Sequence, residues 1–459
     1  MYKLKFMIET NRQDYKKELE EVVYMFSSGD GLEISHFQKS SDGEYVDTVT
    51  VNGNTYSVKN CHTPKDLLDK KRYEKRFSKL CLYNALSNYF GVKLKWGALT
   101  GIRPIKMARD LGENFEREFK SVFGVSNKKI ELVKEILQTQ EGLYDKNSKY
   151  SGLFIGIPFC PSRCAYCSFI SEEIAKTKYA EEYKNALVKE ITALSGKTEK
   201  VRSVYVGGGT PVCLTDEHFS EILSAVNKVV KSGIEFTVEA GRPDVINKEK
   251  LQIMKNAGVT RVCVNPQTFS DRTLKLIGRK HTASDVIEKF ELVKSYGFII
   301  NCDIIAGLTG ESLQDFQNTV DTAIRLNPEN ITVHTLCLKK GAKLKTETDR
   351  LEIDFIDQMI DYSHKALKKA GYNPYYLYRQ KYAAENLENT GYSKPNKECI
   401  YNIDVMEENS DNPACGANAV SKRVFLSENR IERYGSPKDI KTYVSKIDKI
   451  IDEKNKFFG

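Results

Sequence analysis

The chain has 459 residues, of which 40% are hydrophobic and 29% are charged, a balance typical of a soluble globular protein. This composition excludes collagen-like, disordered and small disulfide-stabilised proteins, and the length predicts two or three domains. The 70 basic and 62 acidic residues leave a net charge of +8. Such a charge permits an acidic protein partner or an anionic ligand, but it does not by itself indicate nucleic acid.

The start of the chain, MYKLKFMIETNRQDY, lacks the apolar core of a signal peptide. No run of residues approaches the ~20 apolar positions that a membrane-spanning helix needs. We therefore expect a cytoplasmic protein without a membrane partner.

Residues 1–145 predict an N-terminal α+β domain of unclear role. A strand at 1–9 and a helix ending near Phe26 are followed by two strands that flank Asn52-Gly53, a strong hairpin signal. The apolar spacing is helical over 64–90, and two or three further helices are expected after Arg103. The surface of the 64–90 helix is basic, which we interpret as a solvated helix face in preference to a nucleic-acid site. Its basic residues are Lys65, Lys70, Lys71, Arg72, Lys75, Arg76 and Lys79.

Residues 150–345 follow a polar linker at 144–151 and alternate short apolar runs with amphipathic stretches. Near-continuous apolar strands separated by helices predict a parallel sheet buried on both faces. Six such units can form an open doubly wound sheet or a barrel, complete or partial, with the chemistry at the carboxyl ends of the strands. The predicted strands are 153–159, 201–206, 234–240, 260–265, 298–308 and 330–336. The expected helices are 173–194, 216–231, 283–296 and 312–326.

Residues 346–459 predict a mixed C-terminal region that covers the substrate. It begins with a helix at 351–370 and continues into aromatic-rich, less periodic sequence. The segment YYLYRQK combines aromatic faces with cations, which suits a ligand that is both flat and anionic. An aromatic core segment with exposed basic ends explains the same segment equally well. Its candidate residues are Tyr375, Tyr376, Tyr378, Arg379 and Lys381.

Three of the eleven cysteines, Cys160, Cys164 and Cys167, fall within eight residues, directly after the first predicted parallel strand. This C-x3-C-x2-C spacing can hold three irons of a [4Fe–4S] cluster from one loop and leave the fourth iron open. Zinc is the rival interpretation, with His281 or His334 as a fourth ligand. A third interpretation is that the three cysteines are buried thiols that bind no metal. We interpret the scattered single cysteines of the chain in that way.

The cysteine motif and its surroundings resemble the radical S-adenosylmethionine enzymes, in which the amino and carboxylate groups of S-adenosylmethionine chelate the open iron. The sequence is similar in particular to the anaerobic, oxygen-independent coproporphyrinogen III dehydrogenases, in the longer form found in clostridia and bacilli. The motifs that carry this resemblance are GIPFCPSRCAYCSF, GGGTP, TVEAGRPD, NPQTF, LIGRKH and DIIAGLTGES. It implies a partial parallel (β/α)6 barrel, an α/β fold.

The resemblance also implies the cofactors, a [4Fe–4S] cluster and S-adenosylmethionine, and the residues that bind them. Cys160, Cys164 and Cys167 are the implied cluster ligands. No residue is assigned to catalysis itself. The residues that match S-adenosylmethionine contacts are Phe154, Tyr166, Gly208, Gly209, Thr210, Glu239, Gln267, Arg279 and Asp303.

Each of these positions also has a purely structural interpretation. The glycines can serve a tight turn, and Glu239 is costly to bury unless it is paired, for example with Arg242. Arg279 can be a solvated arginine at a helix end, and Tyr166 can be an ordinary packing residue.

One position departs from the family pattern: Phe169 stands where classical members carry a fourth cysteine. Three cysteines still suffice for the cluster, but relatives without the fourth include haem-carrying chaperones. The leading hypothesis is oxygen-independent oxidative decarboxylation of coproporphyrinogen III to protoporphyrinogen IX. A haem-binding chaperone or another tetrapyrrole-modifying radical protein is the alternative, and a nucleic-acid-modifying protein ranks last. Expected partners are a tetrapyrrole and a reducing flavodoxin or ferredoxin, with the chain a monomer.

Overall fold

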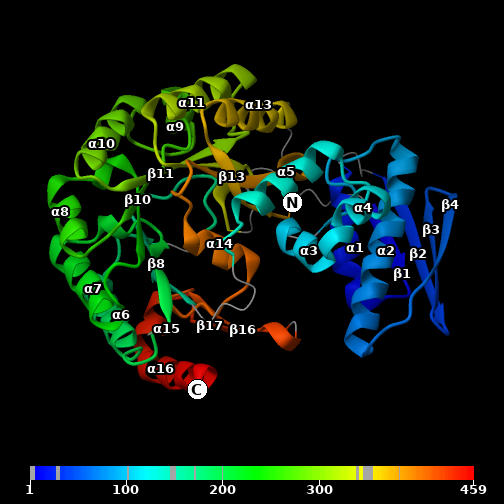
Figure 1. Cartoon of the computed structure of the whole chain (residues 1–459), viewed down its shortest axis with the longest axis horizontal. Coiled ribbons are helices and arrows are strands. Elements are labelled where there is room, and N and C mark those ends of the chain that lie inside the picture. Colours follow the sequence, from blue (N-terminus) through cyan, green and yellow to red (C-terminus); the bar gives the residue numbers. More distant parts are fainter. Residues whose placement is uncertain are drawn as a thin grey trace. The chain divides into compact units, whose positions relative to one another are not determined.

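A computed structural model describes residues 6–26, 31–100, 103–144, 151–169, 172–198, 200–337, 341–344, 355–381, 383–428 and 430–459 (Figure 1). The chain folds as two compact units. Unit 1 comprises Met1–Lys134 with Arg379–Leu387, and unit 2 comprises Glu135–Tyr378 with Glu388–Gly459. The division into regions 1–145, 150–345 and 346–459 remains a prediction.

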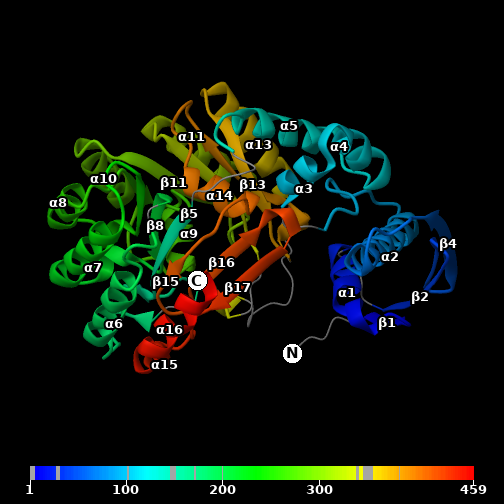
Figure 2. The same cartoon turned by 60° about the horizontal axis from the view of Figure 1, so that its bottom comes forward.

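Unit 1 contains a four-stranded sheet in the order β1-β2-β3-β4, with α1 and α2 packed on one face (Figure 2). The predicted hairpin is confirmed, because β3 and β4 are antiparallel and both turn residues have positive φ, 45° at Asn52 and 84° at Gly53. Alternate residues of β2 and β3 are buried against the helices, as expected for a sheet with one covered face. The strands are Phe6–Thr10, Leu32–Ser41, Glu44–Val51 and Asn54–Cys61.

The helices of unit 1 also follow the sequence pattern. The helix expected over 64–90 is α2, which begins at Leu67 after the cap Asp66 and ends at Phe90 before Gly91, whose φ is 65°. A buried hydrogen-bond network joins three neighbouring strands: His36 of β2 contacts Thr10 of β1 at 2.8 Å and Asp47 of β3 at 3.2 Å. The other helical segments are η1 Gln13–Tyr15, α1 Lys16–Met25, α3 Pro104–Leu111, η2 Gly112–Asn114, α4 Phe115–Arg117, η3 Glu118–Val122 and α5 Asn127–Thr139.

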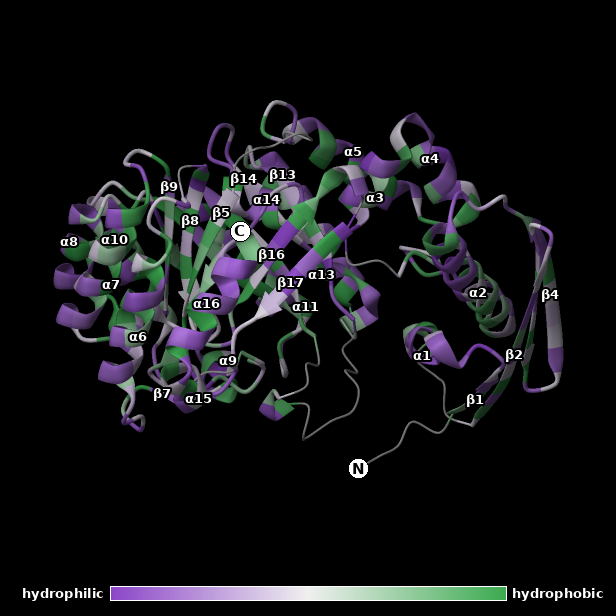
Figure 3. Ribbon diagram, turned by 90° about the horizontal axis from the view of Figure 1, so that it is seen from below, coloured by the Kyte–Doolittle hydropathy of each residue, from purple (hydrophilic) through white to green (hydrophobic). Residues whose placement is uncertain are grey.

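Unit 2 is built on a nine-stranded sheet whose order is β13-β14-β12-β11-β10-β9-β8-β5-β15. The six strands from β5 to β12 are parallel and adjacent in chain order, so the six predicted strands are confirmed. Their side chains are almost all buried, and in Figure 3 the strands are largely hydrophobic while the covering helices carry both hydrophilic and hydrophobic residues. These strands are β5 Ser151–Ile157, β8 Val201–Gly208, β9 Glu235–Gly241, β10 Arg261–Val264, β11 Ile299–Ala306 and β12 Asn330–Thr335.

Helices cover the outer side of this sheet and begin close to the predicted positions. Their N-caps are the expected short polar side chains, such as Thr215, Thr282 and Ser312. The first helix begins later than predicted, at Ala180, because Glu172-Glu173 form a short strand against Phe159-Cys160. The helices are α6 Ala180–Thr192, α7 Asp216–Val229, α8 Lys248–Asn256, α9 Asp271–Leu276, α10 Ala283–Ser295 and α11 Leu313–Leu326, with η4 Pro211–Cys213 and η5 Pro243–Val245.

The C-terminal region is more regular than its sequence indicates, because its strands extend both sides of the sheet. β14 pairs antiparallel with β12, and β15 pairs parallel with β5. The predicted helix is α13, described from Ile356 to Lys369. The remaining elements are β6 Phe159–Cys160, β7 Glu172–Glu173, β13 Asn373–Arg379, η6 Ala384–Asn386, β14 Glu388–Ser393, α14 Ile400–Glu407, β15 Ala414–Cys415, β16 Val420–Phe425, η7 Leu426–Glu428, β17 Arg430–Gly435, α15 Ile440–Ser445 and α16 Ile447–Phe458.

A buried ion pair fastens the C-terminal helices to the sheet layer. Glu190 of α6 is 1% exposed and accepts hydrogen bonds from Lys454 of α16, from Tyr443 of α15 and from the Gly416 amide at 2.8 Å. All three donors come from the last fifty residues of the chain. The carboxylate therefore joins the C-terminal segment to the first parallel βα unit, β5 and α6.

Replacing Lys454 by methionine should lower the free energy of unfolding by about 3–5 kcal/mol, since it leaves the Glu190 carboxylate buried without a cation. Lys449→Met in the same helix is the control: Lys449 is 71% exposed, so its loss should cost less than about 1 kcal/mol. Urea denaturation followed by circular dichroism measures both values. Equal losses in the two variants would show that the buried pair has no special role.

Candidate active site

The three clustered cysteines lie in the loop that follows β5. Cys164 is buried, and Cys160 and Cys167 are partly exposed. Neighbouring segments hold the loop by its backbone: the Ala165 amide donates to the Ile277 carbonyl at 3.0 Å, and the Leu344 amide donates to the Ala165 carbonyl at 3.0 Å. The loop is thus shaped before any ligand binds.

Two buried arginines surround the cysteine loop. Arg242, just after β9, donates to Ser162 Oγ at 2.6 Å and forms a paired contact with Asp244. Arg279 contacts the Cys164 thiol, and its pKa is raised because nearby acidic groups, Tyr166 and Cys164, outweigh the effect of burial. Guanidinium groups here compensate the negative charge that three thiolates would carry.

The donor set fits a [4Fe–4S] cluster better than a single ion. In the part of the chain that the structure describes, no three His, Cys, Asp or Glu side chains are grouped to hold one metal ion. Both candidate fourth ligands for zinc lie beside a carboxylate: His281 is 3.6 Å from Asp244, with no hydrogen bond at either ring nitrogen, and His334 is 3.6 Å from Asp303. A cubane instead distributes its cysteines over different irons, so three thiols from one loop with nearby cations suit it.

The sequence predicts that the site lies at the carboxyl ends of the parallel strands. The loops that follow these strands, which we call the rim, do contact one another. Thr210, after β8, donates to Cys160 Sγ at 3.6 Å, and Arg279 donates to the Asn265 carbonyl at 2.6 Å. Gln267 pairs by its backbone with β11, since its amide donates to the Asp303 carbonyl at 2.9 Å. The carboxyl ends of the parallel strands therefore meet around the cysteine loop.

The glycines at 207–209 have a structural reason of their own. Gly208 has a φ of 103°, and a Cβ at Gly209 would stand 2.3 Å from the Phe159 carbonyl oxygen. The Gly209 and Thr210 amides donate to the carbonyls of Ile157 and Phe159 at 2.8 and 2.7 Å. The tight-turn interpretation is thus correct for Gly209, and its contact with S-adenosylmethionine stays a prediction.

Gly209→Ala should lower the free energy of unfolding of the apoprotein by about 2–3 kcal/mol, because the added methyl group must push the carbonyls of Phe159 and Ile157 away. Gly435→Ala is the control, since a Cβ there meets nothing within 4 Å and should change stability by less than about 0.5 kcal/mol. Chemical denaturation of both apoproteins provides the comparison. A Gly209→Ala protein as stable as the control would contradict the assigned close approach.

Glu239 lies at the end of β9, and its partners differ from the predicted structural one. It is hydrogen bonded by the Tyr205 hydroxyl and by Asn265 Nδ2, the latter at 2.9 Å, whereas Arg242 pairs with Asp244. Burial, reinforced by the negative charge of Asp303, raises the pKa of Glu239 to about 7. A partly accessible carboxyl group without a cationic side chain as its hydrogen-bond partner is suited to a positively charged ligand group.

Asp303 of β11 is held by Asn301 Nδ2 at 2.8 Å and lies 3.6 Å from His334 Nε2. The other imidazole nitrogen, Nδ1, is 3.2 Å from the Tyr378 hydroxyl. Burial alone would raise the pKa of Asp303, but the hydrogen bond and charge of His334 hold it below its ordinary value. His334 thus lies next to a predicted site residue, although the sequence suggested it only as a possible zinc ligand.

Tyr166 and Phe154 already contact protein groups. The Tyr166 hydroxyl accepts from Arg279 at 3.2 Å, and burial raises the pKa of Tyr166. The Phe154 ring stacks near Tyr205, and its amide donates to the Pro413 carbonyl at 2.9 Å. A cofactor contact from Phe154 would therefore use other atoms than its amide nitrogen. Arg279 is 7% exposed, so it is not a solvated arginine at a helix end.

The YYLYRQK residues are mostly core residues. Tyr375 and Tyr376 are 0% and 5% exposed, and Arg379 donates to the Leu99 carbonyl within unit 1. Lys381 forms an ion pair with Glu21, also within unit 1. Tyr378 contacts a residue of the site, His334. The packing interpretation of this segment therefore holds for Tyr375 and Tyr376, whereas Arg379, which it expected to be exposed, is buried.

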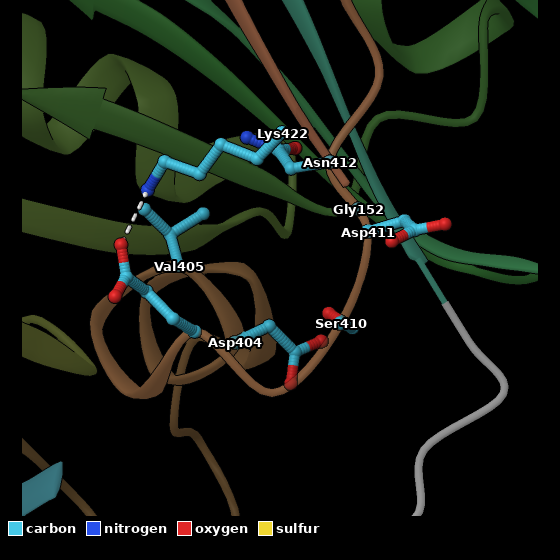
Figure 4. Close-up of a pocket in the computed structure, with 8 residues that line it drawn as sticks. Gly152, Asp404, Val405, Ser410, Asp411, Asn412 and Lys422 are labelled. Carbon is cyan, nitrogen blue, oxygen red and sulfur yellow. Dashed lines mark ion pairs between the residues drawn. The ribbon is translucent and has the colours of Figure 1, made fainter. Parts of the chain in front are cut away.

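A small hollow lies at the opposite ends of the strands, where β5 begins (Figure 4). Its charged groups are paired: Lys422 and Glu408 are 3.6 Å apart, and Asp404 binds Arg202. The amino ends of parallel strands are the stabilising end of such folds, so we assign no ligand to it. The lining residues are Gly152, Asp404, Val405, Glu408, Ser410, Asp411, Asn412 and Lys422.

The sequence of this chain is similar to known proteins. The Radical SAM superfamily model matches residues 154–323. HemZ of Bacillus subtilis strain 168, an oxygen-independent coproporphyrinogen-III oxidase-like protein, is 35% identical over 440 residues, which cover 89% of this chain and 87% of HemZ. This chain belongs to the oxygen-independent coproporphyrinogen-III oxidase-like family. As radical SAM proteins, its members use a [4Fe–4S] cluster and S-adenosylmethionine.

Two further similarities bear on this radical SAM protein. The heme chaperone HemW of Bacillus subtilis strain 168 is 36% identical over 192 residues, which cover 40% of this chain and 50% of HemW. The structure of coproporphyrinogen III oxidase HemN from Escherichia coli superposes with a TM-score of 0.53 at 18% identity, over 67% of this chain and 71% of that one. The latter supports the radical SAM α/β fold. None of the described helices is long and apolar enough to cross a membrane.

Proposed function

We propose that this radical SAM protein oxidatively decarboxylates two propionate side chains of coproporphyrinogen III without oxygen, which yields protoporphyrinogen IX. The observation that carries the proposal is the similarity to HemZ over 89% of the chain, including the parts outside residues 154–323. The similarity to HemW covers 40% of the chain. The N-terminal and C-terminal parts are therefore shared with the oxidase-like relative.

In this proposal, Cys160, Cys164 and Cys167 hold the cluster. When bound, the cluster and S-adenosylmethionine supply a 5′-deoxyadenosyl radical, which removes a hydrogen atom from the β-carbon of a propionate. The propionate then loses carbon dioxide and gives one electron to an acceptor, which leaves a vinyl group. The residues proposed to orient S-adenosylmethionine are Phe154, Tyr166, Gly208, Gly209, Thr210, Glu239, Gln267, Arg279 and Asp303.

Two charged residues of the rim, Glu239 and Arg279, suit groups of opposite charge in S-adenosylmethionine. The carboxyl group of Glu239 is directed at a position suited to a cationic amino group, since its hydrogen-bond partners are Tyr205 and Asn265. Arg279 can bind a carboxylate, because it is buried and already faces the acidic Cys164 and Tyr166 groups. Holding both ends fixes the distance between radical and target, which is the main contribution a protein makes to such a step.

A haem-binding chaperone is the second candidate, favoured by two observations. The 36% identity to HemW lies over 192 residues, and Phe169 stands in place of the fourth cysteine of classical dehydrogenases. Phe169 is 57% exposed directly beyond the cysteine loop. Such a protein would bind haem stoichiometrically and form no vinyl product.

The experiment uses anaerobic protein with a reconstituted cluster, a chemical reductant, S-adenosylmethionine and coproporphyrinogen III. Mass spectrometry quantifies 5′-deoxyadenosine and the porphyrins after oxidation. We expect porphyrin products lighter by one and then two formic-acid equivalents, formed together with deoxyadenosine. Formation of deoxyadenosine without a change in the porphyrin would contradict the proposed substrate but support the radical chemistry. A Soret band on mixing with haem, with neither product, would favour the chaperone.

A further inference from the structure

Asp303 is supported by a row of side chains that begins in the C-terminal strand β13. His334 Nε2 lies 3.6 Å from the Asp303 carboxylate, and His334 Nδ1 lies 3.2 Å from the Tyr378 hydroxyl. The register of β11 and β12 pairs Asp303 with Thr332, so Asp303 and His334 lie on the same face of the sheet. The three side chains therefore link β13 through β12 to β11.

A second row of hydrogen bonds from β13 ends at the same carboxylate. The hydroxyls of Tyr376 and Thr332 are 3.2 Å apart, and Thr332 Oγ1 donates to Asn301 Oδ1 at 3.4 Å. Asn301 Nδ2 in turn donates to Asp303 Oδ1 at 2.8 Å. β14 lies between β13 and β12, and Tyr376 crosses it at Gly391, where a Cβ would overlap the tyrosine ring. Two tyrosines of the C-terminal region thus reach toward Asp303.

His334 is the basic member of the set of titratable groups around Asp303. Burial raises the pKa of a carboxyl group, and for Asp303 the hydrogen bond and the charge of His334 reverse that effect. His334 also acts to lower the pKa of Glu239, although burial keeps that pKa raised. The titratable groups in electrostatic contact with Asp303 include Tyr205 of β8, Glu239 of β9, Cys263 of β10, Cys302 of β11 itself, His334 of β12, and Tyr376 and Tyr378 of β13.

We propose that His334, held in place by Tyr378, is a positioning residue that keeps Asp303 ionised and directed at S-adenosylmethionine. This rests on the proposed function, in which Asp303 is one of the residues that orient the cofactor. An ionised carboxylate accepts hydrogen bonds from hydroxyl groups more strongly than a neutral carboxyl group does. A carboxylate whose orientation is already fixed by its neighbours also loses less side-chain freedom when the ligand binds.

Access to Asp303 fits this role. The side chains of Asp303 and His334 are 16% and 25% exposed, so a ligand can reach the carboxylate and a substitution at His334 leaves the hydrophobic core intact. Tyr378 and Tyr376, in contrast, act on the cofactor only through other side chains. The aromatic YYLYRQK segment therefore contributes to the site without contacting the ligand itself.

A double-mutant cycle tests whether His334 acts through Asp303. Equilibrium dialysis at pH 7 gives the Kd of S-adenosylmethionine for the cluster-loaded wild type, His334→Gln, Asp303→Asn and the double variant. His334→Gln should raise the Kd at least about fivefold in the wild type but less than about twofold in Asp303→Asn, where the imidazole has no carboxylate to hold. Equal effects in the two backgrounds, as a merely structural role would give, would overturn the proposal.

The pH dependence of binding tests the charge of Asp303 separately. Glu239→Gln serves as the background, because it removes the other carboxyl group of the site, whose pKa is about 7. With His334 present, Asp303 stays ionised from pH 5.5 to 7, so binding should not change with pH. With His334→Gln added, burial raises the pKa of Asp303, and the affinity should fall at least about threefold from pH 7 to pH 5.5. Tyr378→Phe should act in the same direction with a smaller effect.

His364 provides a matched control on α13. Its Nδ1 lies 3.3 Å from the Tyr392 hydroxyl and its Nε2 lies 3.7 Å from Glu135, so it has the same kinds of neighbour as His334. Its side chain is 31% exposed, close to the value for His334. His364→Gln in the Glu239→Gln background should bind S-adenosylmethionine without pH dependence. A flat profile for His334→Gln, or the same slope in both histidine variants, would contradict the assigned role.

Failure of the proposed function gives a different result. Binding of S-adenosylmethionine is measured without coproporphyrinogen, so it does not depend on the identity of the substrate. A protein that shows the expected coupling between His334 and Asp303 but leaves the porphyrin unchanged would retain the positioning residue and lose the assigned substrate. A protein that decarboxylates coproporphyrinogen III and shows no coupling would retain the function and lose the role of His334.

Discussion

Replacing Cys164 by serine should remove the [4Fe–4S] cluster and with it all formation of 5′-deoxyadenosine. In the proposal only three thiolates, all from one loop, hold the cluster. Cys164 is the buried one of the three and contacts Arg279. A serine hydroxyl is a poor substitute for a thiolate as an iron ligand. Iron and sulfide analysis after anaerobic reconstitution, together with the visible absorbance of the cluster, measures the loss.

Cys213 offers a matched control, since it is a partly buried thiol close to Cys160 but outside the C-x3-C-x2-C motif. Burial raises the pKa of Cys213 to about 12, as expected for a thiol that packs as a small apolar side chain. Cys213→Ser should therefore keep its iron content and its activity. If Cys164→Ser keeps the visible absorbance of the cluster while Cys213→Ser loses it, the assignment of the ligands is wrong.

Replacing Glu239 by glutamine should weaken S-adenosylmethionine binding and abolish its dependence on pH. A carboxyl group with a pKa of about 7 is mostly neutral at pH 6 and mostly charged at pH 7.5. Its charged fraction, and with it the affinity for a cationic ligand group, should rise by roughly eightfold between these two values. Over this range the α-amino group of the ligand stays largely protonated. Equilibrium binding of S-adenosylmethionine to the cluster-loaded protein at several pH values gives the profile.

The raised pKa also has a consequence for stability. A carboxyl group whose folded-state pKa lies above its unfolded value favours the folded state less as pH rises from about 4.5 to 7. The apoprotein should therefore lose up to about 3 kcal/mol over this range through Glu239, and Glu239→Gln should remove that loss. The variant is expected to be more stable than the wild type at pH 8 and about equally stable at pH 4.5.

Glu311 provides the control for both measurements. Burial raises its pKa to about 7 as well, but its hydrogen-bond partner is Thr268, on the loop after β10. Glu311→Gln should change the pH dependence of stability in the same sense and leave the pH dependence of S-adenosylmethionine binding intact. A flat binding profile in Glu311→Gln, or an unchanged profile in Glu239→Gln, would remove Glu239 from the binding site.

Much of the fold follows from local patterns in the sequence. The apolar runs at 201–206 and 330–336 are buried on both faces in the structure, which is why they could be recognised as parallel strands. The Asn52-Gly53 turn was predictable because positive φ at two neighbouring residues favours this pair. The strands of the C-terminal region were missed, because β14 is entirely buried without period-two alternation and contains Gly391.

The site was predictable as a set of residues but not as a set of contacts. Alternation along β9 places Glu239 on one face of the sheet, yet its partners come from β8 and from the end of β10. Tyr205 could have been suspected as a polar aromatic residue in an otherwise apolar strand. His334 could have been found only through Asp303, because the register of β11 and β12 brings the two together.

The sequence by itself determined the cysteine spacing, the positions of the six parallel strands and the ends of the strands at which the site residues lie, because each depends on residues close together in the chain. The tertiary structure decided which side chains form ion pairs and hydrogen bonds with one another and which are buried. Arg242 pairs with Asp244 and Ser162 instead of Glu239, and Tyr375 and Tyr376 enter the core. Hydrogen-bond partners depend on the register of neighbouring strands and on the packing of distant segments, which no local pattern encodes.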